Sequence, residues 1–353
     1  MTRWPTQRVA MLASALLLGA AGLAGCGGND DVPSEVVLVT HDSFAVSKDV
    51  KAAFEQESGL KLKLLQGGDA GEALNRALLT AGDPQGDVLF GVDDNLLSRA
   101  LAGGLFDAYS SPELDAVDPD FTPPDDRVTP IDHGEVCLNY DRSWFREHGV
   151  APPHSIDDLL LHRYENLLVV ENPATSSPGL AFLLATIARY GDDRWQTYWR
   201  GLRANGVRVV DGWEEAYTQQ FSGAAGSPGK RPIVVSYATS PAAEVIYASK
   251  PLTAAPTAVV EDGCFRQIEY AGVLRGAPNP AGAKKLIDFM LSERFQADVP
   301  GSMFVYPVRD GVTLPEAFRK FAIQPQQPLT LPPEDIAAHR DDWVDEWTRI
   351  VLR

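Results

Sequence analysis

The sequence has few cysteines, no long apolar segment beyond its first residues, and none of the common motifs of enzymes or metal sites. Its six histidines do not follow a metal-binding spacing such as H-E-x-x-H. It has no G-x-S-x-G nucleophile elbow, and Gly229-Lys230 is followed by Arg231 where a phosphate loop requires serine or threonine. We therefore expect no enzyme, no cofactor and no metal, although an enzyme with dispersed catalytic residues would leave no motif.

The chain is also poor in positive charge. It has 31 Lys and Arg residues against 48 Asp and Glu, which gives a formal net charge of −17. This balance argues against nucleic acid or an anionic lipid surface as a partner. The hydrophobic share of 44% is enough to bury a large core, and the length exceeds what a single core usually fills. We therefore expect two lobes.

The first 26 residues contain the one pronounced apolar run. Arg3 and Arg8 lead into apolar residues 9–18, and Leu-Ala-Gly-Cys ends at Cys26. This pattern is typical of a secretory signal and is too short for a membrane span. The last four residues resemble a bacterial lipobox, in which the cysteine carries the lipid anchor. We predict a signal peptide (1–25), a lipidated tether (26–35) and a place at the outer, periplasmic face of the bacterial cytoplasmic membrane. An ordinary signal peptide with a chance cysteine is the alternative.

Two cysteines remain, Cys137 and Cys264. Outside the cytoplasm an isolated pair of cysteines can oxidise to a disulfide. Both also lie in apolar, strand-like segments, which suits two separate buried thiols equally well. The sequence leaves both interpretations open.

Strand-like and helical patterns alternate after the tether, which is typical of βαβ units with a mainly parallel sheet. A Pro- and Asp-rich stretch over 111–130 is expected to be a long loop. The last helix places Trp343, Trp347 and Ile350 on one face, where we expect them to be core residues. The expected strands are 36–39, 62–65, 87–90, 135–140, 167–170, 207–210, 233–237 and 268–274, and the expected helices are 50–57, 72–80, 95–101, 180–190, 213–221, 280–291 and 333–353.

Two Ser-Pro junctions follow expected strands, at Ser177-Pro178 and Ser240-Pro241. Serine at the cap and proline in the first turn are ordinary helix starts. A strand-to-helix turn also points free N–H groups beyond the carboxyl end of the strand, where open α/β sheets bind ligands. Taken alone, each junction is therefore an ordinary helix start. At the end of a strand, its free N–H groups also make it a candidate ligand contact.

Several short motifs occur in order along nearly the whole chain. They include His41-Asp42-Ser43-Phe44, the stretch DVLFGVDDNLL over 87–97, GWEEAY over 212–217 and SYATSP over 236–241. Each is weak alone, but together they resemble the thiamine-binding subunit of bacterial thiamine ABC transporters. The pair of motifs GWEEAY and SYATSP is the most specific part of the resemblance.

The resemblance implies an α/β, two-lobed type II periplasmic binding protein fold, with mainly parallel sheets joined by crossover hinge strands. Lobe I would comprise 36–133 and 270–353, and lobe II would comprise 134–269. The crossovers would then pass near Cys137 and Cys264, which favours a disulfide at the hinge. The implied partners are thiamine or a thiamine phosphate, an ABC permease with its ATPase, and the membrane through the lipid anchor only.

The resemblance also implies a set of ligand-binding residues in the cleft between the lobes. A flat thiazolium cation suits an aromatic sandwich, which Trp213 and Tyr237 would supply. The Ser176 turn would hold a hydroxyl or phosphate tail. Taken alone, Trp213 and Tyr237 could equally be core residues. Asp69, before the second helix, could equally be only an N-cap. The implied site residues are Trp213, Tyr237, Ser176, Ser177, Asp69, Asp42, His41 and Phe304.

Two of these positions, and Ala70 next to Asp69, depart from the family pattern. His41 replaces a tyrosine, Ala70 a glycine, and Phe304 a tryptophan. The ligand is therefore expected to be thiamine, with its phosphate esters or a related pyrimidine as alternatives. A ferric-ion or small-anion binding protein of the same fold is the second hypothesis, although Tyr237 is followed by Ala238 and lacks the adjacent second tyrosine common at ferric sites. A lipoprotein that acts only as a scaffold is the third.

Overall fold

The computed structural model describes residues 33–121 and 125–353, in which strands and helices alternate from the first strand onward. The expected signal peptide, the lipidated Cys26 and most of the tether lie outside the described residues. Polar side chains start the first three helices, because Ser47, Asp69 and Asp93 each accept a backbone N–H at the N-cap. These elements are β1 (Glu35–Thr40), α1 (Lys48–Ser58), β2 (Lys61–Gln66), α2 (Ala70–Leu79), β3 (Val88–Asp93) and α3 (Asp94–Ala102).

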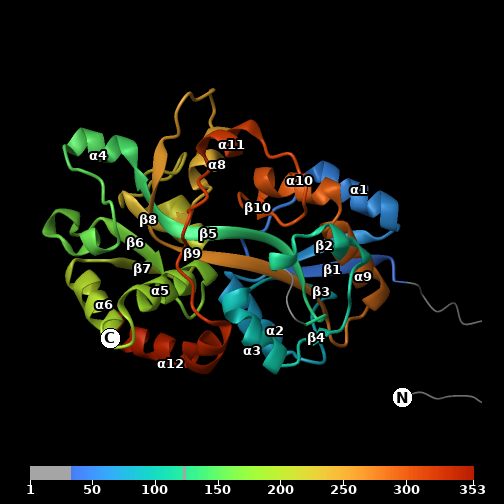
Figure 1. Cartoon of the computed structure of the whole chain (residues 1–353). Helices are drawn as coiled ribbons and strands as arrows, with labels where there is room; N and C mark the ends of the chain where they lie inside the picture. Colours follow the sequence, from blue (N-terminus) through green and yellow to red (C-terminus); the bar gives the residue numbers. More distant parts are fainter. Residues whose placement is uncertain (1–32, 122–124) are drawn as a thin grey trace, which may run out of the picture. The chain divides into compact units, whose positions relative to one another are not determined.

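Two long strands, β5 (Thr129–Asp141) and β9 (Thr257–Leu274), pair antiparallel through the middle of the sheet (Figure 1). The C-terminal part of β9 also pairs with β3, and the C-terminal part of β5 also pairs with β8 (Ile233–Tyr237). The two strands therefore connect two groups of shorter strands, which is the crossover arrangement that the resemblance implies.

The strand order in the sheet is β2-β1-β3-β9-β5-β8-β6-β7, with short strands β10 on β5 and β4 on β9. The pairs in the outer groups, β2-β1-β3 and β8-β6-β7, are parallel, and the pairs made by β5 and β9 are antiparallel. Parallel neighbours need crossover connections, which the helices between them supply. The fold is therefore α/β with two lobes, while the lobe boundaries given above stay a prediction.

The second group of strands repeats the alternation. Ser176 starts its longest helix, because its hydroxyl accepts the Gly179 N–H at 3.3 Å and Pro178 lies in the first turn. A single π-helical turn, Ala216–Gln220, follows a short α-helical turn. The elements are β6 (Leu168–Glu171), α5 (Ser177–Tyr190), α6 (Trp195–Ala204), β7 (Arg208–Val210), α7 (Trp213–Glu215) and α8 (Ser240–Ile246).

The remaining elements include two departures from the expected pattern. The 111–130 stretch contains two short 3-10 helices, Pro112–Ala116 and Pro119–Phe121, and β5 begins within it. Both β5 and β9 are longer than expected, because their pairing with each other orders residues whose own sequences favour turns. The other elements are β4 (Phe106–Asp107), α4 (Arg142–His148), α9 (Pro280–Met290), α10 (Glu293–Ser302), β10 (Tyr306–Pro307), α11 (Glu316–Phe321) and α12 (Pro333–Val351).

The C-terminal helix α12 packs on α6 through its aromatic face (Figure 1). Trp347 is fully buried and meets Trp199 edge to face, with ring centroids 5.4 Å apart. Ile350 is buried beside it and Trp343 packs against the same core. The expectation that these residues belong to the core is therefore confirmed.

Cys137 in β5 and Cys264 in β9 form a disulfide. Both are buried, next to Ala238, where the register of the β5–β9 pair shifts between Val136 and Leu138. The alternative of two separate thiols is therefore wrong. The bond lies on the two strands that connect the two halves of the sheet.

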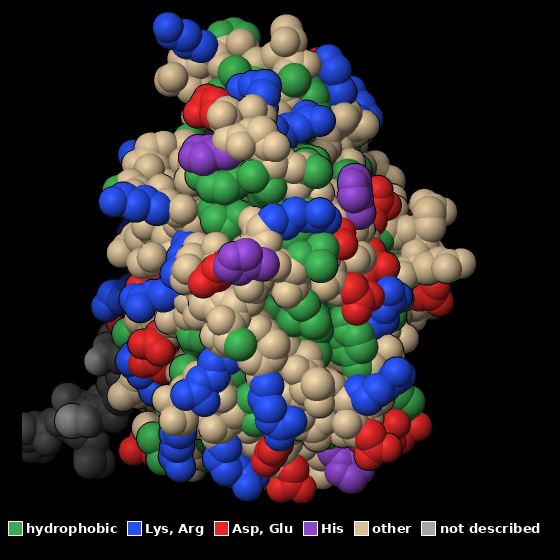
Figure 2. Space-filling model, turned by 90° about the vertical axis from the view of Figure 1, so that its left-hand side faces the viewer, with side chains coloured by type: hydrophobic (Ala, Val, Ile, Leu, Met, Phe, Trp, Pro, Cys, Tyr) green, Lys and Arg blue, Asp and Glu red, His purple; other side chains and the backbone are tan. Residues whose placement is uncertain are grey.

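The surface carries both signs of charge despite the net charge of −17. On the face shown in Figure 2, lysine and arginine side chains alternate with acidic and histidine side chains around small apolar patches. Among the described helices, none is both long enough and apolar enough to span a membrane.

Candidate ligand-binding site

A cavity of about 380 Å³ collects residues from both halves of the sheet. Its lining comes from the turn after β1, from α7 with its π-helical turn, from β8 and α8, from β9, and from the segment between α10 and β10. Aromatic and acidic side chains stand out among smaller residues in this lining. They are Trp213, Tyr217, Tyr237, Tyr247, Phe304, Glu214, Glu244 and Glu269, with His41 beside them.

Trp213 is held in place by its own hydrogen bond and by a stacked neighbour. Its Nε1 donates to the Ser236 hydroxyl at 2.9 Å, and its ring stacks on Tyr217 with centroids 5.0 Å apart and planes 17° from parallel. The Tyr217 hydroxyl in turn donates to Glu244 Oε1 at 2.9 Å. One face of the indole is therefore covered by Tyr217, and a ligand can stack only on the other.

The two rings of the expected sandwich do not face each other as parallel plates. Trp213 and Tyr237 meet edge to face, with centroids 6.3 Å apart and planes at 64°. A flat ligand between parallel rings needs both planes aligned, so this part of the expectation differs from the structure. Both residues line the cavity, and each offers it a separate aromatic surface.

Phe304 and Tyr247 meet at the edge of the same cavity. Their rings pack edge to face with centroids 5.1 Å apart, and the Tyr247 hydroxyl donates to the Gly301 carbonyl at 3.0 Å. Phe304 has a φ of +62°, a left-handed conformation that is rare for a bulky side chain and costs roughly 1–3 kcal/mol. Such strain is retained where the surroundings hold the residue in place.

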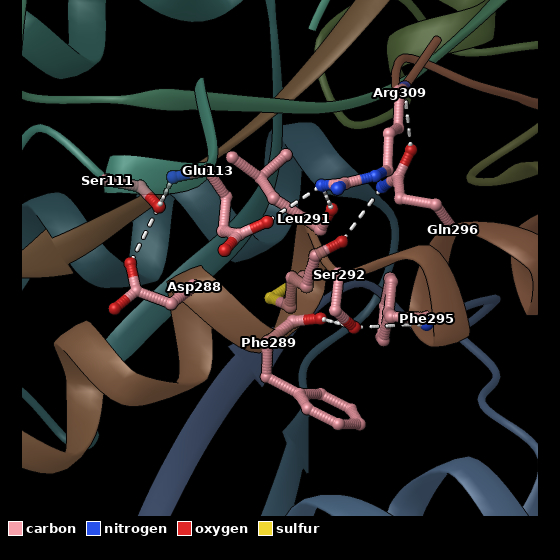
Figure 3. Close-up of polar contacts among 10 residues, drawn as sticks. Ser111, Glu113, Asp288, Phe289, Leu291, Ser292, Phe295, Gln296 and Arg309 are labelled. Carbon is pink, nitrogen blue, oxygen red and sulfur yellow. Dashed lines mark hydrogen bonds and ion pairs between the residues drawn. The ribbon is translucent and has the colours of Figure 1, made fainter. Parts of the chain in front are cut away.

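Polar contacts hold Ser292 and Arg309, which precede and follow Phe304 in the sequence (Figure 3). Before it, the Ser292 hydroxyl caps α10 by accepting the Phe295 N–H at 3.3 Å. After it, Arg309 donates to Glu113 Oε2 and to the Leu291 carbonyl, each at 2.8 Å. Phe304 itself is half-buried and lines the cavity.

The lining is acidic as well as aromatic. Glu244 and Glu269 are buried, Glu214 is exposed, and no lysine or arginine occurs among the described residues around the cavity. Burial raises the pKa of Glu244, and it raises the pKa of Glu269 well above its ordinary value, with a further contribution from nearby Asp132. A cation that enters the cavity would therefore meet glutamates that are either ionised, without a compensating positive charge, or neutralised by a proton.

His41 lies against the sheet beside Glu269. Its Nδ1 is 2.8 Å from the Ser43 hydroxyl, and its Nε2 is 3.5 Å from Glu269 Oε1. Burial lowers the pKa of His41 to about 4, so the imidazole is neutral at pH 7. Gly91 makes room for the ring, because a Cβ at this position of positive φ would come within 2.3 Å of the imidazole.

Asp69, Ser176 and Ser177 come together beside the cavity rather than in its lining. One Asp69 oxygen accepts the N–H groups of Ala70 at 2.6 Å and Ser177 at 3.3 Å, and the other accepts the Trp213 N–H at 2.9 Å. Asp69 is therefore the N-cap of α2 and also ties it to the starts of α5 and α7. Asp42 is exposed and is not part of the cavity lining.

Replacing Asp69 with alanine is expected to lower the free energy of unfolding by about 1–2 kcal/mol. The substitution removes a buried acceptor from three backbone N–H groups that belong to different elements. Urea unfolding would measure the loss. Ser177→Ala is the matched control, since it keeps the backbone N–H that donates to Asp69. Equal stability of the two variants would contradict this role of Asp69.

Sequence reasoning missed Tyr217, Glu244, Tyr247 and Glu269 as lining residues. Tyr217 ends the GWEEAY motif, so its place in that motif was an available signal. The others lie in stretches with no distinctive local pattern. Within residues 33–121 and 125–353, no group of three or more His, Cys, Asp or Glu side chains is arranged to hold a metal ion.

Comparison with known proteins gives consistent matches over most of the chain. Residues 83–340 match the family described as bacterial extracellular solute-binding protein. The thiamine-binding periplasmic protein of Escherichia coli strain K12 is 34% identical over 322 residues, which cover 90% of this chain and 94% of the relative. The thiamine-binding periplasmic protein of Brucella melitensis biotype 1 is 31% identical and covers 98% of this chain and 100% of the relative.

The solved structures agree with this assignment. A periplasmic thiamin binding protein superposes with a TM-score of 0.79 at 32% identity, covering 90% of this chain and 96% of the other. Iron-bound HitA from Pseudomonas aeruginosa superposes with a TM-score of 0.70 at 20% identity, covering 89% and 99%, which indicates a shared fold. The two-lobed architecture, the cavity and these matches lead to one conclusion: the chain belongs to the bacterial extracellular solute-binding protein family.

Proposed function

We propose that this protein captures thiamine outside the cytoplasm and delivers it to the membrane permease of an ABC importer. The observation that carries the proposal is the cavity, which combines aromatic surfaces with three carboxyl groups and no lysine or arginine among its described lining residues. The curated relatives at 31–34% identity are thiamine-binding periplasmic proteins, which supports the same ligand. The protein acts by binding and release and not as an enzyme.

Thiamine has the chemistry that this cavity suits. Its thiazolium ring is flat and carries a permanent positive charge, so it can stack on the open face of Trp213 or on Tyr237 while the glutamates compensate its charge. A cation over an aromatic face contributes roughly 0.5–2 kcal/mol when desolvated. The ferric-ion hypothesis has no comparable use for the aromatic rings.

Phosphate esters place an additional demand on the site. A phosphate group would need donors, and the lining has no lysine or arginine among its described residues. The N–H group of Ser177, which was expected to hold a phosphate, donates to Asp69 instead. Free thiamine is therefore the first ligand to test, and its esters are the second.

A ligand panel tests the proposal. Thiamine, thiamine monophosphate, thiamine diphosphate, ferric citrate and inorganic phosphate would each be added to the purified protein, first in a thermal-shift assay and then in calorimetry. Thiamine is expected to raise the melting temperature and to bind at one site, because a ligand that binds only the folded state stabilises it. Stabilisation by ferric citrate or phosphate without stabilisation by thiamine would refute the proposal.

We also propose that lipidation at Cys26 anchors the protein at the outer face of the cytoplasmic membrane. The support is the order of charged, apolar and small residues before Cys26. Cys26→Ser is expected to release the protein from the membrane fraction into the soluble exported fraction, as measured by fractionation and immunoblotting. Cys26→Ser protein that stays with the membranes would exclude the lipid anchor.

A further inference from the structure

Three acidic residues form a row across three neighbouring strands next to the cavity. Asp93 of β3 pairs with Glu269 of β9, and Glu269 pairs with Asp132 of β5. Residues directly opposite each other on antiparallel strands share a face of the sheet, and like charges in such positions are destabilising. Of the three, Glu269 reaches the lining of the cavity.

Asp132 has no hydrogen-bond donor among the described residues at either carboxyl oxygen, and it is fully buried. Asp93, by contrast, accepts the Leu96 N–H at 2.9 Å and the Gln267 amide at 3.1 Å. The carboxyl group of Glu269 lies opposite that of Asp132 on the neighbouring strand, and both side chains are buried. Two carboxyl groups held this close in a buried site do not readily ionise together, so one proton stays with the pair.

The other titratable and charged groups around Glu269 do not replace that proton. His41 faces it from the turn after β1 and is neutral at pH 7, as argued above. Asp69 faces it from α2, and Tyr237 faces it from β8.

Asp94 is buried next to Asp93, and burial raises its pKa well above the ordinary value. Arg340 of α12 acts on Asp93, and it also pairs with Asp341. Burial raises the pKa of Asp132 to about 7 and that of Glu269 well above its ordinary value. The Glu269–Asp132 pair therefore keeps a proton near neutral pH in the ligand-free protein.

We propose that a cationic ligand displaces the proton shared by Glu269 and Asp132, so that the affinity of this cavity for a cation rises with pH. The inference rests on the proposed function and names the counter-charge of that same site. No covalent bond to the ligand forms: the Glu269 carboxyl O–H breaks, its proton goes to solvent, and the carboxylate pair balances the ligand's charge.

The direction of the pH dependence follows from the protonated and the ionised state of the Glu269–Asp132 pair. A bound cation favours the ionised pair and lowers its pKa, so ligand binding releases a proton at every pH between the lowered and the original value. In that window the association constant rises about tenfold per pH unit for each proton released. Above the original pKa the pair is already ionised and the dependence levels off. A neutral molecule of the same shape would gain nothing from this exchange.

Calorimetry of the full chain with thiamine tests the proposal. The binding enthalpy would be measured at neutral pH in two buffers of different ionisation enthalpy, and the affinity would be measured from about pH 6 to about pH 8. We expect release of close to one proton and an affinity that rises over this range by about tenfold or more. Thiamine binding with a constant affinity and no dependence on the buffer would overturn the inference and leave the proposed function standing. Absence of thiamine binding at every pH would refute both.

Three variants separate the pair from the general charge of the cavity. Glu269→Gln is expected to abolish proton release and to weaken binding, and Asp132→Asn is expected to reduce proton release while the cavity lining stays intact. Glu214→Gln is the matched control: it also removes a carboxylate from the lining, but proton release should persist. Equal proton release in Asp132→Asn and Glu214→Gln would contradict the assignment to the pair.

A measurement on the ligand-free protein tests the inference independently of thiamine binding. Carbon-13 NMR of the labelled, ligand-free protein should show a carboxyl group that titrates above pH 6, and this titration should shift in Asp132→Asn. A spectrum in which every carboxyl group of the wild-type protein titrates below about pH 5 would overturn the inference, whatever the calorimetry shows.

Discussion

Replacing Cys137 and Cys264 together with alanine is expected to lower the free energy of unfolding by about 3–5 kcal/mol. The two cysteines are 127 residues apart in the sequence, so their disulfide closes a long loop in the unfolded chain. In the chain-entropy model this constraint increases with loop length, and a long loop gives a large effect. The same change should lower the melting temperature by several degrees.

Guanidinium unfolding of the wild-type protein with and without a reductant, beside the double variant, would measure this effect. The reduced wild-type protein and the double variant should agree, because both lack the bond. The single variants Cys137→Ala and Cys264→Ala show whether one remaining thiol alters the result. A double variant as stable as the oxidised wild-type protein would show that the disulfide does not contribute to stability.

Replacing Trp213 with alanine is expected to weaken thiamine binding by about 1–3 kcal/mol, or roughly fivefold to 150-fold. The substitution removes the open indole face from the cavity and leaves Tyr217 without its stacked neighbour. It also removes the donor to the Ser236 hydroxyl. Calorimetry on the folded variant would measure the loss, with circular dichroism as the check on folding.

Two conservative variants separate the causes of that loss. Trp213→Phe keeps an aromatic face but has no N–H, so a partial loss of affinity is expected. Tyr237→Phe keeps the second ring and removes only its hydroxyl, so a smaller effect is expected. Wild-type affinity in a folded Trp213→Ala protein would show that the ligand does not stack on this residue, and the other aromatic residues of the lining would become the candidates.

The alternation of strands and helices could be predicted because each segment carries its own signal. β-branched runs mark β1 and β6, and Asp69 and Ser176 stand at the starts of their helices as N-caps. Helix α6 was not among the expected elements, although its apolar residues recur at the helical spacing of Trp195, Tyr198, Trp199 and Leu202. The sequence therefore carries a local signal for this helix.

The full lengths of β5 and β9 could not be predicted in the same way. Thr129 and Pro130 end a Pro- and Asp-rich stretch that favours turns when taken alone. They become part of a strand because β9, more than a hundred residues later, pairs with them along almost all of β5. Such long-range pairing overrides local propensity and has no local signal.

Half of the expected site residues reach the cavity. His41, Trp213, Tyr237 and Phe304 line it. They were found through the order of short motifs along the chain, which reflects the shared family. Ser176, Ser177 and Asp69 form a neighbouring junction, and Asp42 is not part of the lining. Their roles in binding remain predictions that the ligand panel and the variants test.

The sequence by itself determined the α/β class, the family resemblance, and Trp213, Tyr237 and Phe304 as candidate site residues, because these depend on local patterns and on motifs that keep their order. Only the tertiary structure decided how those residues face one another. The disulfide, the edge-to-face meeting of Trp213 with Tyr237, and the in-register row that includes Glu269 and Asp132 all depend on which distant segments pair. The charge of the cavity depends on that pairing too, since burial in the folded sheet sets the pKa of each carboxyl group.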